Sequence, residues 1–296
     1  MTAHGVSDAE LRHRYGQVFD GVAEEYDRER PTYPHELIEA AMKRGGLSAG
    51  DPVVEVGCGT GLLTASLVAH GLEVDAIDPG ENMIRLAERR VGEGAPVRFH
   101  RGRFEDVALG GSSFAGGSSF AGVFSATAFH WIEPEIGWAR AAALLRPRGV
   151  LALIQYSEVA DPRTEQDRNA LHAALAKVAP EIAAGWPGTR SADEILSGAA
   201  ERRSNISAVW SWIGRHDLTV PDAATLFTDV QIDSVPIYYE LTADRLNGFL
   251  RTTSLYARLD PGQQVRLEHE NRLVADGAGG VVRSSELALL VTARVR

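Results

Sequence analysis

The stretch VVEVGCGTGLLT, Val53–Thr64, decides the fold of this chain. Four strand-forming positions, with the acid Glu55 among them, lead into a turn that carries glycines at alternate positions, Gly57, Gly59 and Gly61. A helix-like run follows the turn. Because glycine has no side chain, such a turn allows a ligand to approach the backbone closely. The sequence therefore predicts a ligand-binding turn between a buried strand and a helix.

The pattern of strand then helix repeats along the chain beyond this turn. Strands are expected at 52–57, 72–79, 96–102, 121–129 and 149–156, and later at 230–242 and 286–295. Helices are expected between the first five, at 61–71, 81–91 and 134–147. This alternation is typical of βαβ units and predicts an α/β fold with a seven-stranded, mostly parallel sheet. Such a sheet binds ligands beyond the carboxyl ends of its strands.

Helical segments are expected on both sides of this core. A capping box at Ser7 and Glu10 predicts a helix that ends before Pro31, and further helices are expected at 35–46, 244–259 and 261–277. Residues 157–230 are rich in Ala, Trp and polar residues and predict a helical insertion over the active edge of the sheet. The predicted division is therefore 1–156 (lid and ligand-binding core), 157–230 (insertion or acceptor cap) and 231–296 (final strands and helices).

One short repeat interrupts the pattern before the fourth strand. The hexapeptide GSSFAG at 111–116 recurs at 117–122. Its Gly and Ser content fits either a flexible linker between domains or a local expansion of a loop. We favour the loop expansion, because the second copy leads directly into a strand, and we assign the repeat no function.

Composition limits the class of protein. The chain has 296 residues, is 44% hydrophobic and 24% charged, and carries a net charge of −10 without a basic run, which disfavours nucleic acid as a partner. The single cysteine excludes an internal disulfide framework, and no metal site is expected. The N-terminal sequence lacks an apolar signal core, and no apolar run reaches membrane-spanning length. We expect a cytoplasmic monomer or homodimer with no membrane partner.

The ligand of the glycine turn follows from what the turn lacks. A dinucleotide turn reads G-x-G-x-x-G, but Leu62 occupies the position of the third glycine. A phosphate-binding loop needs a lysine, and none follows the turn. The carboxylate of Glu55 would repel a pyrophosphate, whereas it suits a ligand with positive charge or amine donors.

A second acid, Asp78, ends the next predicted strand. At that place a carboxylate can accept both hydroxyls of a ribose, although it could also merely cap the following helix. Together, the turn and the two acids indicate a nucleoside with a ribose diol and a cationic, amine-bearing tail. S-adenosylmethionine meets that description.

These residues resemble a known family. VVEVGCGTGLLT and VDAIDP are similar to motifs I and II of the class I S-adenosylmethionine-dependent methyltransferases. The segments FDGVAEEYDRERPTYP, SATAFHWIEP and LNGFLRTTSLYARL resemble the branch that includes trans-aconitate methyltransferase. The resemblance implies a doubly wound, Rossmann-like sheet with an N-terminal helical lid and a helical insertion. It covers the chain from about residue 15 onward, and 157–230 are its least distinctive part.

The resemblance implies which residues bind the cofactor. Motifs I and II supply Glu55, Gly57, Cys58, Gly59, Thr60, Gly61, Asp78 and Pro79. Cys58 also fits a small buried filler. The lid segment supplies Tyr26 and Arg30.

Further cofactor contacts are expected at three strand ends. Met83 starts the helix after Asp78 and either packs on adenine or belongs to the core. Phe104 and Glu105 follow the third strand, where relatives hold adenine, and relatives more often carry a small residue at the position of Phe104. Ser125 and Ala126 end the fourth strand, beside the reacting methyl group.

Acceptor-binding residues are expected in FHWIEP and in the lid. His130 and Trp131 follow a strand and can line a pocket, and aromatic faces attract a sulfonium by up to about 2 kcal/mol when desolvated. His130 either lines this pocket or acts as a general base. Tyr33 is expected to contact the acceptor. The tryptophans Trp210 and Trp212, with Trp186, fit an acceptor pocket or the core of the insertion equally well.

The expected activity is methyl transfer from S-adenosylmethionine to a small-molecule acceptor, at oxygen or nitrogen, with carboxylates included. The sulfonium is already a strong electrophile, so the main contribution of the protein is alignment, worth effective molarities of roughly 10⁵ to 10⁸ M. Two alternatives remain: a binding protein that keeps the fold without turnover, and a nicotinamide-dependent oxidoreductase, which Leu62 disfavours.

Overall fold

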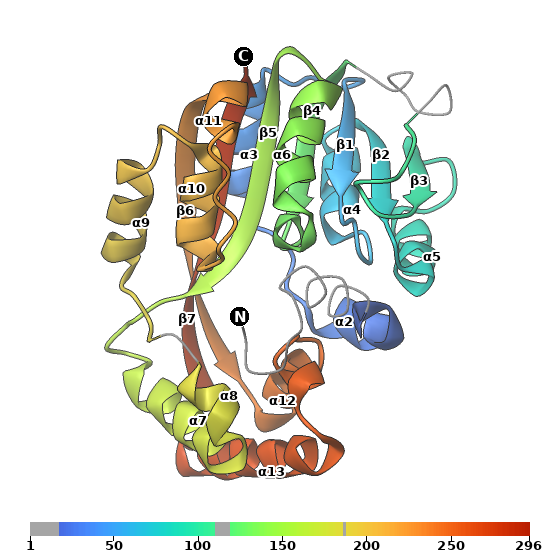
Figure 1. The fold of residues 1–296 in the computed structure, drawn as a ribbon. Helices are drawn as coiled ribbons and strands as arrows, with labels where there is room; N and C mark the ends of the chain where they lie inside the picture. The colour runs from blue at the N-terminus through green and yellow to red at the C-terminus, as the bar shows by residue number, and fades with distance from the viewer. Residues whose placement is uncertain (1–17, 110–118, 186–187) are drawn as a thin grey trace.

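One seven-stranded sheet organises the molecule in a computed structural model that describes residues 18–109, 119–185 and 188–296 (Figure 1). Its strand order is β3-β2-β1-β4-β5-β7-β6. The first five strands are parallel, and β7 is antiparallel to both of its neighbours. The strands are β1 (Pro52–Val56), β2 (Glu73–Asp78), β3 (Val97–Arg101), β4 (Phe120–Ala126), β5 (Leu145–Glu158), β6 (Phe227–Leu241) and β7 (Val282–Val295). The predicted α/β fold and all seven strands are confirmed.

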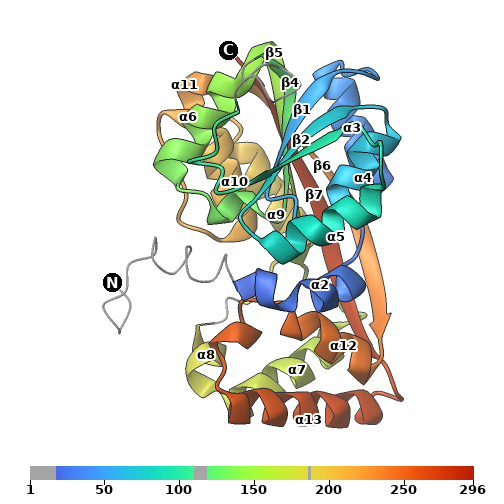
Figure 2. The same cartoon turned by 90° about the vertical axis from the view of Figure 1, so that its right-hand side faces the viewer.

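Helices cover both faces of this sheet (Figure 2). One face carries α3 (His35–Gly45), α4 (Leu62–Ala69) and α5 (Glu81–Val91); the other carries α6 (Pro134–Leu144), α10 (Ile206–Gly214) and α11 (Ala223–Leu226). Because helices cover β1 and β4 on both faces, these strands have almost no exposed residues. Such strands are typically continuous apolar runs in the sequence. Trp210 is fully buried in the second face's core, and Trp212 donates to the carbonyl of Ile195, so both tryptophans belong to the core of that layer.

The helices that follow β5 lie in two separate parts of the molecule. Helices α7 (Glu165–Val178) and α8 (Pro180–Ala184) lie below the sheet together with α12 (Ala243–Arg251) and α13 (Pro261–Gly277), whereas α9 (Ala192–Glu201) and α10 stay beside it (Figure 1). The N-terminal elements η1 (Val18–Val22) and α2 (Ala23–Glu29) lie between the sheet and the lower helices (Figure 2). The division at 157 and 230 stays a prediction.

Two predicted helix ends are wrong. The helix expected to reach Pro147 ends at Leu144, because β5 begins at Leu145. The helix expected at 244–259 ends at Arg251, and only a 3₁₀ turn follows at Tyr256–Arg258. The hydroxyls of Thr252 and Thr253 each donate to a carbonyl of α12, and such local bonds compete with helical ones.

Three sequence features lie outside the described residues. They are the capping box at Ser7 and Glu10, most of the GSSFAG repeat (111–118) and Trp186. The last residues of the second copy, from Phe120, begin β4 as expected.

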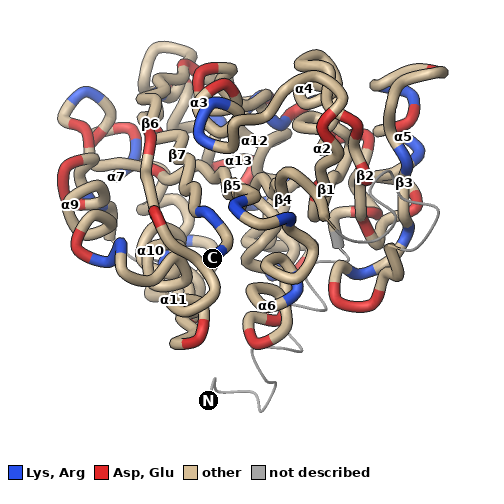
Figure 3. The backbone as a smooth tube through the Cα atoms, turned by 90° about the horizontal axis from the view of Figure 1, so that it is seen from above, with Lys and Arg blue, Asp and Glu red and all other residues tan. Residues whose placement is uncertain are grey.

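Charges are mixed over the described surface. Acidic and basic residues are interspersed along the helices and loops in Figure 3, without a continuous basic stripe in that view. Across the described ranges, no helix combines the length and the apolar character that a membrane crossing requires. Those residues also hold no group of three or more His, Cys, Asp or Glu that could bind a metal ion.

Candidate functional site

A cavity of about 740 Å³ opens at the carboxyl ends of β1, β2 and β4, and we call it the cofactor cleft. The strand order reverses between β1 and β4, the place where open α/β sheets bind their ligands. Thirteen of the predicted site residues line it: Tyr26, Arg30, Tyr33, Gly57, Gly59, Asp78, Pro79, Met83, Phe104, Glu105, Ala126, His130 and Trp131. The fold therefore brings together residues that the sequence analysis predicted in the lid, in both motifs and in the fourth strand.

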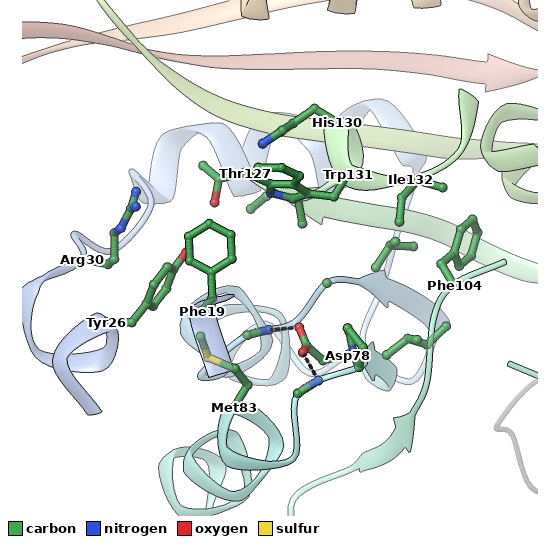
Figure 4. A pocket seen from close by; sticks show the side chains of 18 of the residues that line it. Phe19, Tyr26, Arg30, Asp78, Met83, Phe104, Thr127, His130, Trp131 and Ile132 are labelled. Atoms are coloured by element: carbon green, nitrogen blue, oxygen red, sulfur yellow. Dashed lines mark hydrogen bonds between the residues drawn. The ribbon is translucent and has the colours of Figure 1, made fainter. Parts of the chain in front are cut away.

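Asp78 stands at the edge of the cofactor cleft with its carboxylate held by the backbone (Figure 4). Its Oδ2 accepts from the N–H of Gly59 at 2.9 Å, and its Oδ1 accepts from the N–H of Gly80 at 2.8 Å. Burial raises the pKa of Asp78 to about 6, although these two hydrogen bonds oppose the shift. Each carboxylate oxygen can accept more than one bond, so both remain able to accept from a ligand.

The glycine turn needs glycine at Gly57 for two reasons. The residue has φ +71°, a left-handed conformation, and a Cβ there would lie 2.3 Å from the Cβ of Ala128. The turn is closed by the N–H groups of Gly57 and Cys58, which both donate to the carbonyl of Ile77. The backbone of β1 is thus brought against β2 at the floor of the cleft.

Five predicted cofactor residues do not line the cleft. Glu55 is buried and accepts from Thr64 Oγ1 at 2.6 Å. Burial raises the pKa of Glu55 to about 8, with a further contribution from Asp78. Ser125 donates to the carbonyl of Val56 at 2.8 Å and so joins β4 to β1. The others are Cys58, Thr60 and Gly61.

Each of these three is accounted for locally. Cys58 is buried, and burial raises the pKa of its thiol. The hydroxyl oxygen of Thr60 is buried without a hydrogen-bond partner among the described residues. Gly61 precedes α4 with φ +81°. The roles assigned to all five stay predictions.

An aromatic wall closes the side of the cleft opposite Asp78 (Figure 4). Phe19 meets Tyr26 edge to face at 6.0 Å between ring centroids and Trp131 at 5.7 Å. The sequence did not single out Phe19, because nothing in its local pattern separates it from an ordinary core residue.

Asp20 fixes this wall to the sheet and was also missed. Its Oδ1 accepts from the backbone N–H of Asn82 at 2.8 Å and of Met83 at 3.2 Å, so it caps α5 from a distant segment. Two side chains reinforce the attachment, because Arg90 of α5 pairs with Asp27 of α2. Only the folded chain brings these elements together, which explains why the local sequence gave no signal.

Arg30 supplies a cation to the cleft. Its Nε donates to Thr252 Oγ1 at 2.9 Å, and its guanidinium lies 4.9 Å from the ring centroid of Tyr26 and 4.7 Å from that of Phe249. In the described part of the chain it forms no ion pair with a carboxylate. Its charge is therefore available to an anionic group of a ligand.

His130 faces the cleft from the turn Phe129–Trp131. Its ring stacks on that of His216 at 4.8 Å with an interplanar angle of 10°, and its buried Nδ1 has no hydrogen-bond partner among the described residues. Burial, His216 and Arg30 lower the pKa of His130 to about 3. The imidazole is neutral at pH 7 and can accept a hydrogen bond from a ligand.

Glu105 and Phe104 complete the wall of the cleft. Glu105 accepts from the N–H of Glu133 at 3.0 Å and from Arg103 at 2.9 Å; burial alone would raise its pKa, but these bonds lower it. Phe104 beside it is buried.

Tyr33 lies on the acceptor side of the cleft. Its hydroxyl lies 3.0 Å from Thr127 Oγ1, and its ring stacks on Tyr156 at 5.9 Å. Burial raises the pKa of Tyr33, so its hydroxyl keeps its proton at neutral pH.

The residues of the cleft fit S-adenosylmethionine. A held carboxylate faces it beside a turn whose backbone lies open, which suits the hydroxyls of a ribose. An unpaired guanidinium suits a carboxylate, and the aromatic wall suits a sulfonium.

Comparison with known proteins agrees with this fit. Residues 53–149 match the family model described as a methyltransferase domain. An uncharacterized methyltransferase of Mycobacterium tuberculosis is 33% identical over 129 residues, which cover 44% of this chain and 48% of that relative. The match thus spans about half of that relative's length. A demethylmenaquinone methyltransferase of Clavibacter sepedonicus is 26% identical over 69% of this chain and 83% of its own.

Solved structures share the fold. A protein described as a putative type II methyltransferase from Anaeromyxobacter dehalogenans superposes with a TM-score of 0.55 at 20% identity, over 90% of this chain and 97% of its own. This likeness confirms the Rossmann-like sheet. The similarity in sequence to proteins named as methyltransferases lies within part of the chain, and the family model matches residues 53–149.

Proposed function

We propose that this chain transfers a methyl group from S-adenosylmethionine to a small-molecule acceptor at the cofactor cleft. The observation that carries the proposal is Asp78, whose carboxylate is fixed by two backbone N–H groups at the end of β2 and faces the cleft. A carboxylate at that position pairs with the two hydroxyls of a ribose. When bound, the cofactor supplies an electrophilic methyl group.

The residues of the chain hold and align the reactants. Asp78 binds the ribose, Arg30 binds the carboxylate of the cofactor, and Tyr26 with Trp131 surrounds the sulfonium side. The aromatic wall also excludes water from the reacting centre, which strengthens each of these contacts. Met83, Phe104 and Glu105 border the space that remains for adenine.

His130 is a candidate to contact the acceptor. Its neutral imidazole lines the cleft and can accept a proton or a hydrogen bond from an acceptor group. The placement of Tyr33 near Thr127 and Tyr156 supports a role in shaping the acceptor end of the cleft. The trans-aconitate methyltransferase-like branch and an acceptor cap from 157–230 belong to the same proposal.

Binding and turnover test the proposal separately. We expect S-adenosylhomocysteine to bind in calorimetry and to raise the melting temperature, since a ligand selective for the folded state stabilises it. NAD serves as the matched control and should not bind. Binding of NAD without binding of S-adenosylhomocysteine would overturn the proposal, and binding without methyl transfer to any of a panel of carboxylates, phenols and amines would leave only a cofactor-binding protein.

A further inference from the structure

A second cavity lies below the cofactor cleft, and we call it the lower chamber. It has a volume of about 720 Å³ and is enclosed by α7, α12, α13 and the lower ends of the long strands β5, β6 and β7 (Figure 1). Most of its wall is apolar; Leu171, Leu246, Phe249 and Leu267 are examples. A chamber of this size and character suits a drug-sized molecule with an apolar body.

The lower chamber and the cofactor cleft share part of their walls. Pro31, Phe249, Thr253 and Glu286 line both cavities. A molecule in the lower chamber therefore ends beside the cleft, at the place where an acceptor atom would have to meet the methyl group.

Two carboxylates stand at this boundary. Glu158 of β5 and Glu286 of β7 are directly opposite each other in the antiparallel register, and both line the lower chamber. Like charges opposite each other on neighbouring strands are destabilising. Within the described ranges, neither side chain accepts a hydrogen bond or forms an ion pair. Burial raises the pKa of both, and that of Glu286 to about 7.

The cations near the two carboxylates do not fully neutralise the negative charge of Glu286. Arg168 of α7 lies near Glu158 and opposes the rise in its pKa, and Arg30 has the same effect on Glu286. Under the proposed function, however, Arg30 is engaged by the carboxylate of the cofactor. The hydroxyl of Tyr156 and that of Tyr239, which also lie near Glu286, carry no charge at neutral pH because burial raises their pKa values.

We propose that the methyl acceptor is an amine with an apolar body, which fills the lower chamber and binds through its ammonium group to Glu286 and Glu158. This inference rests on the proposed function. An ammonium group relieves the repulsion between the two carboxylates and forms charge-assisted hydrogen bonds with them. An acceptor that carries a carboxylate at this position would add a third negative charge.

The same arrangement provides the chemistry of nitrogen methylation. Glu286 takes a proton from the ammonium, which frees the nitrogen electron pair. That pair forms the new N–C bond while the C–S bond of the sulfonium breaks, and its electrons remain on sulfur as the thioether. The nitrogen then has four bonds, so the product is a methylated ammonium, and the proton taken by Glu286 is released to solvent. A pKa near 7 suits a group that must take a proton from the amine and then release it at neutral pH.

Three probes with one body and different heads test the proposal: 4-phenylbutylamine, 4-phenylbutanol and 4-phenylbutyrate. Calorimetry is done with S-adenosylhomocysteine present. We expect the amine to bind at least about tenfold more tightly than the alcohol, and the carboxylate most weakly. In Glu286→Gln the advantage of the amine over the alcohol should fall to about twofold or less, while the alcohol binds as before.

Glu240→Gln is the matched control, because Glu240 lies on the neighbouring strand β6, is exposed and lines neither cavity. It should keep the wild-type preference for the amine. Since Glu286→Gln removes one of two opposed charges, its melting temperature should equal or exceed that of the wild type. Equal affinity for amine and alcohol, or an amine preference that survives in Glu286→Gln, would overturn the inference. If S-adenosylhomocysteine binds but the amine shows no preference, the proposed function stands and only this inference fails.

Discussion

Asp78 shows how one residue can be prepared for a ligand by the backbone around it. The N–H groups of Gly59 and Gly80 hold its two oxygens in place, so a ligand does not have to order this side chain on binding. Burial raises its pKa to about 6, yet the carboxylate is largely ionised at pH 7. It therefore offers charged hydrogen-bond acceptors to a ligand in the cleft.

We expect Asp78→Ala to weaken binding of S-adenosylhomocysteine, because each lost hydrogen bond to a charged acceptor costs about 1.5–3 kcal/mol. Calorimetry measures the change. Asp106→Ala is the control, since Asp106 follows the neighbouring strand β3, is exposed and does not line the cleft. Unchanged affinity in a folded Asp78→Ala protein would reduce Asp78 to a helix cap.

The surroundings of His130 change the pH at which its ring is expected to titrate. A histidine with an ordinary pKa that acts as a general base would titrate near neutral pH. Because burial, His216 and Arg30 lower its pKa to about 3, the ring stays neutral across the physiological range. His130 itself is thus expected to contribute no ionisation to the pH–rate profile between pH 6 and 8, whether it takes a proton or only lines the cleft.

Substitution separates the two roles where pH does not. If His130 is a general base, both His130→Ala and His130→Gln should lower turnover by roughly 10²–10⁴-fold with little change in cofactor affinity. If it lines the cleft, His130→Gln should keep most of the activity, since glutamine offers a similar volume and a hydrogen-bond acceptor. Single-turnover rates measured with an identified acceptor decide between them. The stacked partner His216 must be intact in both variants.

Among the elements, the turn between β1 and α4 combines a left-handed backbone with a close steric contact. We expect Gly57→Ala to destabilise the fold through left-handed strain of about 1–2 kcal/mol and through the clash with Ala128, which adds about 1–3 kcal/mol. Gly94→Ala is the matched control, because Gly94 also has a positive φ, +80°, but a Cβ there meets nothing. Urea unfolding of the two variants measures the difference. Equal destabilisation would mean that the close approach to Ala128 relaxes without cost.

The sequence predicted elements well where their pattern is local. All seven strands follow from apolar runs between glycines and polar turns, and Asp78 follows from its place at a strand end. What it did not predict depends on distant partners. Asp20 caps a helix from another segment, and Glu158 meets Glu286 only through the register of β5 and β7. The end of α12 was missed because the hydroxyls of Thr252 and Thr253 compete with the helix.

Over the whole molecule, buried carboxyls link stability to pH. Burial raises the pKa of Glu55 from 4.5 to about 8. Its folded pKa exceeds its unfolded pKa, so the stabilisation that it contributes is complete below pH 4.5 and is lost as the pH rises through about 8. Asp78 and Glu286 have the same sign, whereas His130, with its lowered pKa, has the opposite one.

Glu55→Gln should therefore remove part of this pH dependence. Between pH 4.5 and 8 the difference in unfolding free energy between wild type and variant should change by at most about 1.4 kcal/mol per pH unit. The wild type should become less stable relative to the variant as the pH rises. The glutamine oxygen can still accept from Thr64. Urea titrations at several pH values measure the slope, with the exposed Glu88→Gln as control. A parallel pH dependence in wild type and Glu55→Gln would contradict a protonated Glu55.

The position of β7 has a consequence for synthesis of the chain. It is the last of the seven strands in sequence, yet it lies between β5 and β6 in the sheet. Until Val282–Val295 has been synthesised, the long strands β5 and β6 present unpaired edges. The nascent chain is exposed to aggregation during that interval, because its sheet can close only once β7 is available. Recombinant expression should accordingly respond to chaperone supply and to slower synthesis more than the stability of the finished fold would suggest.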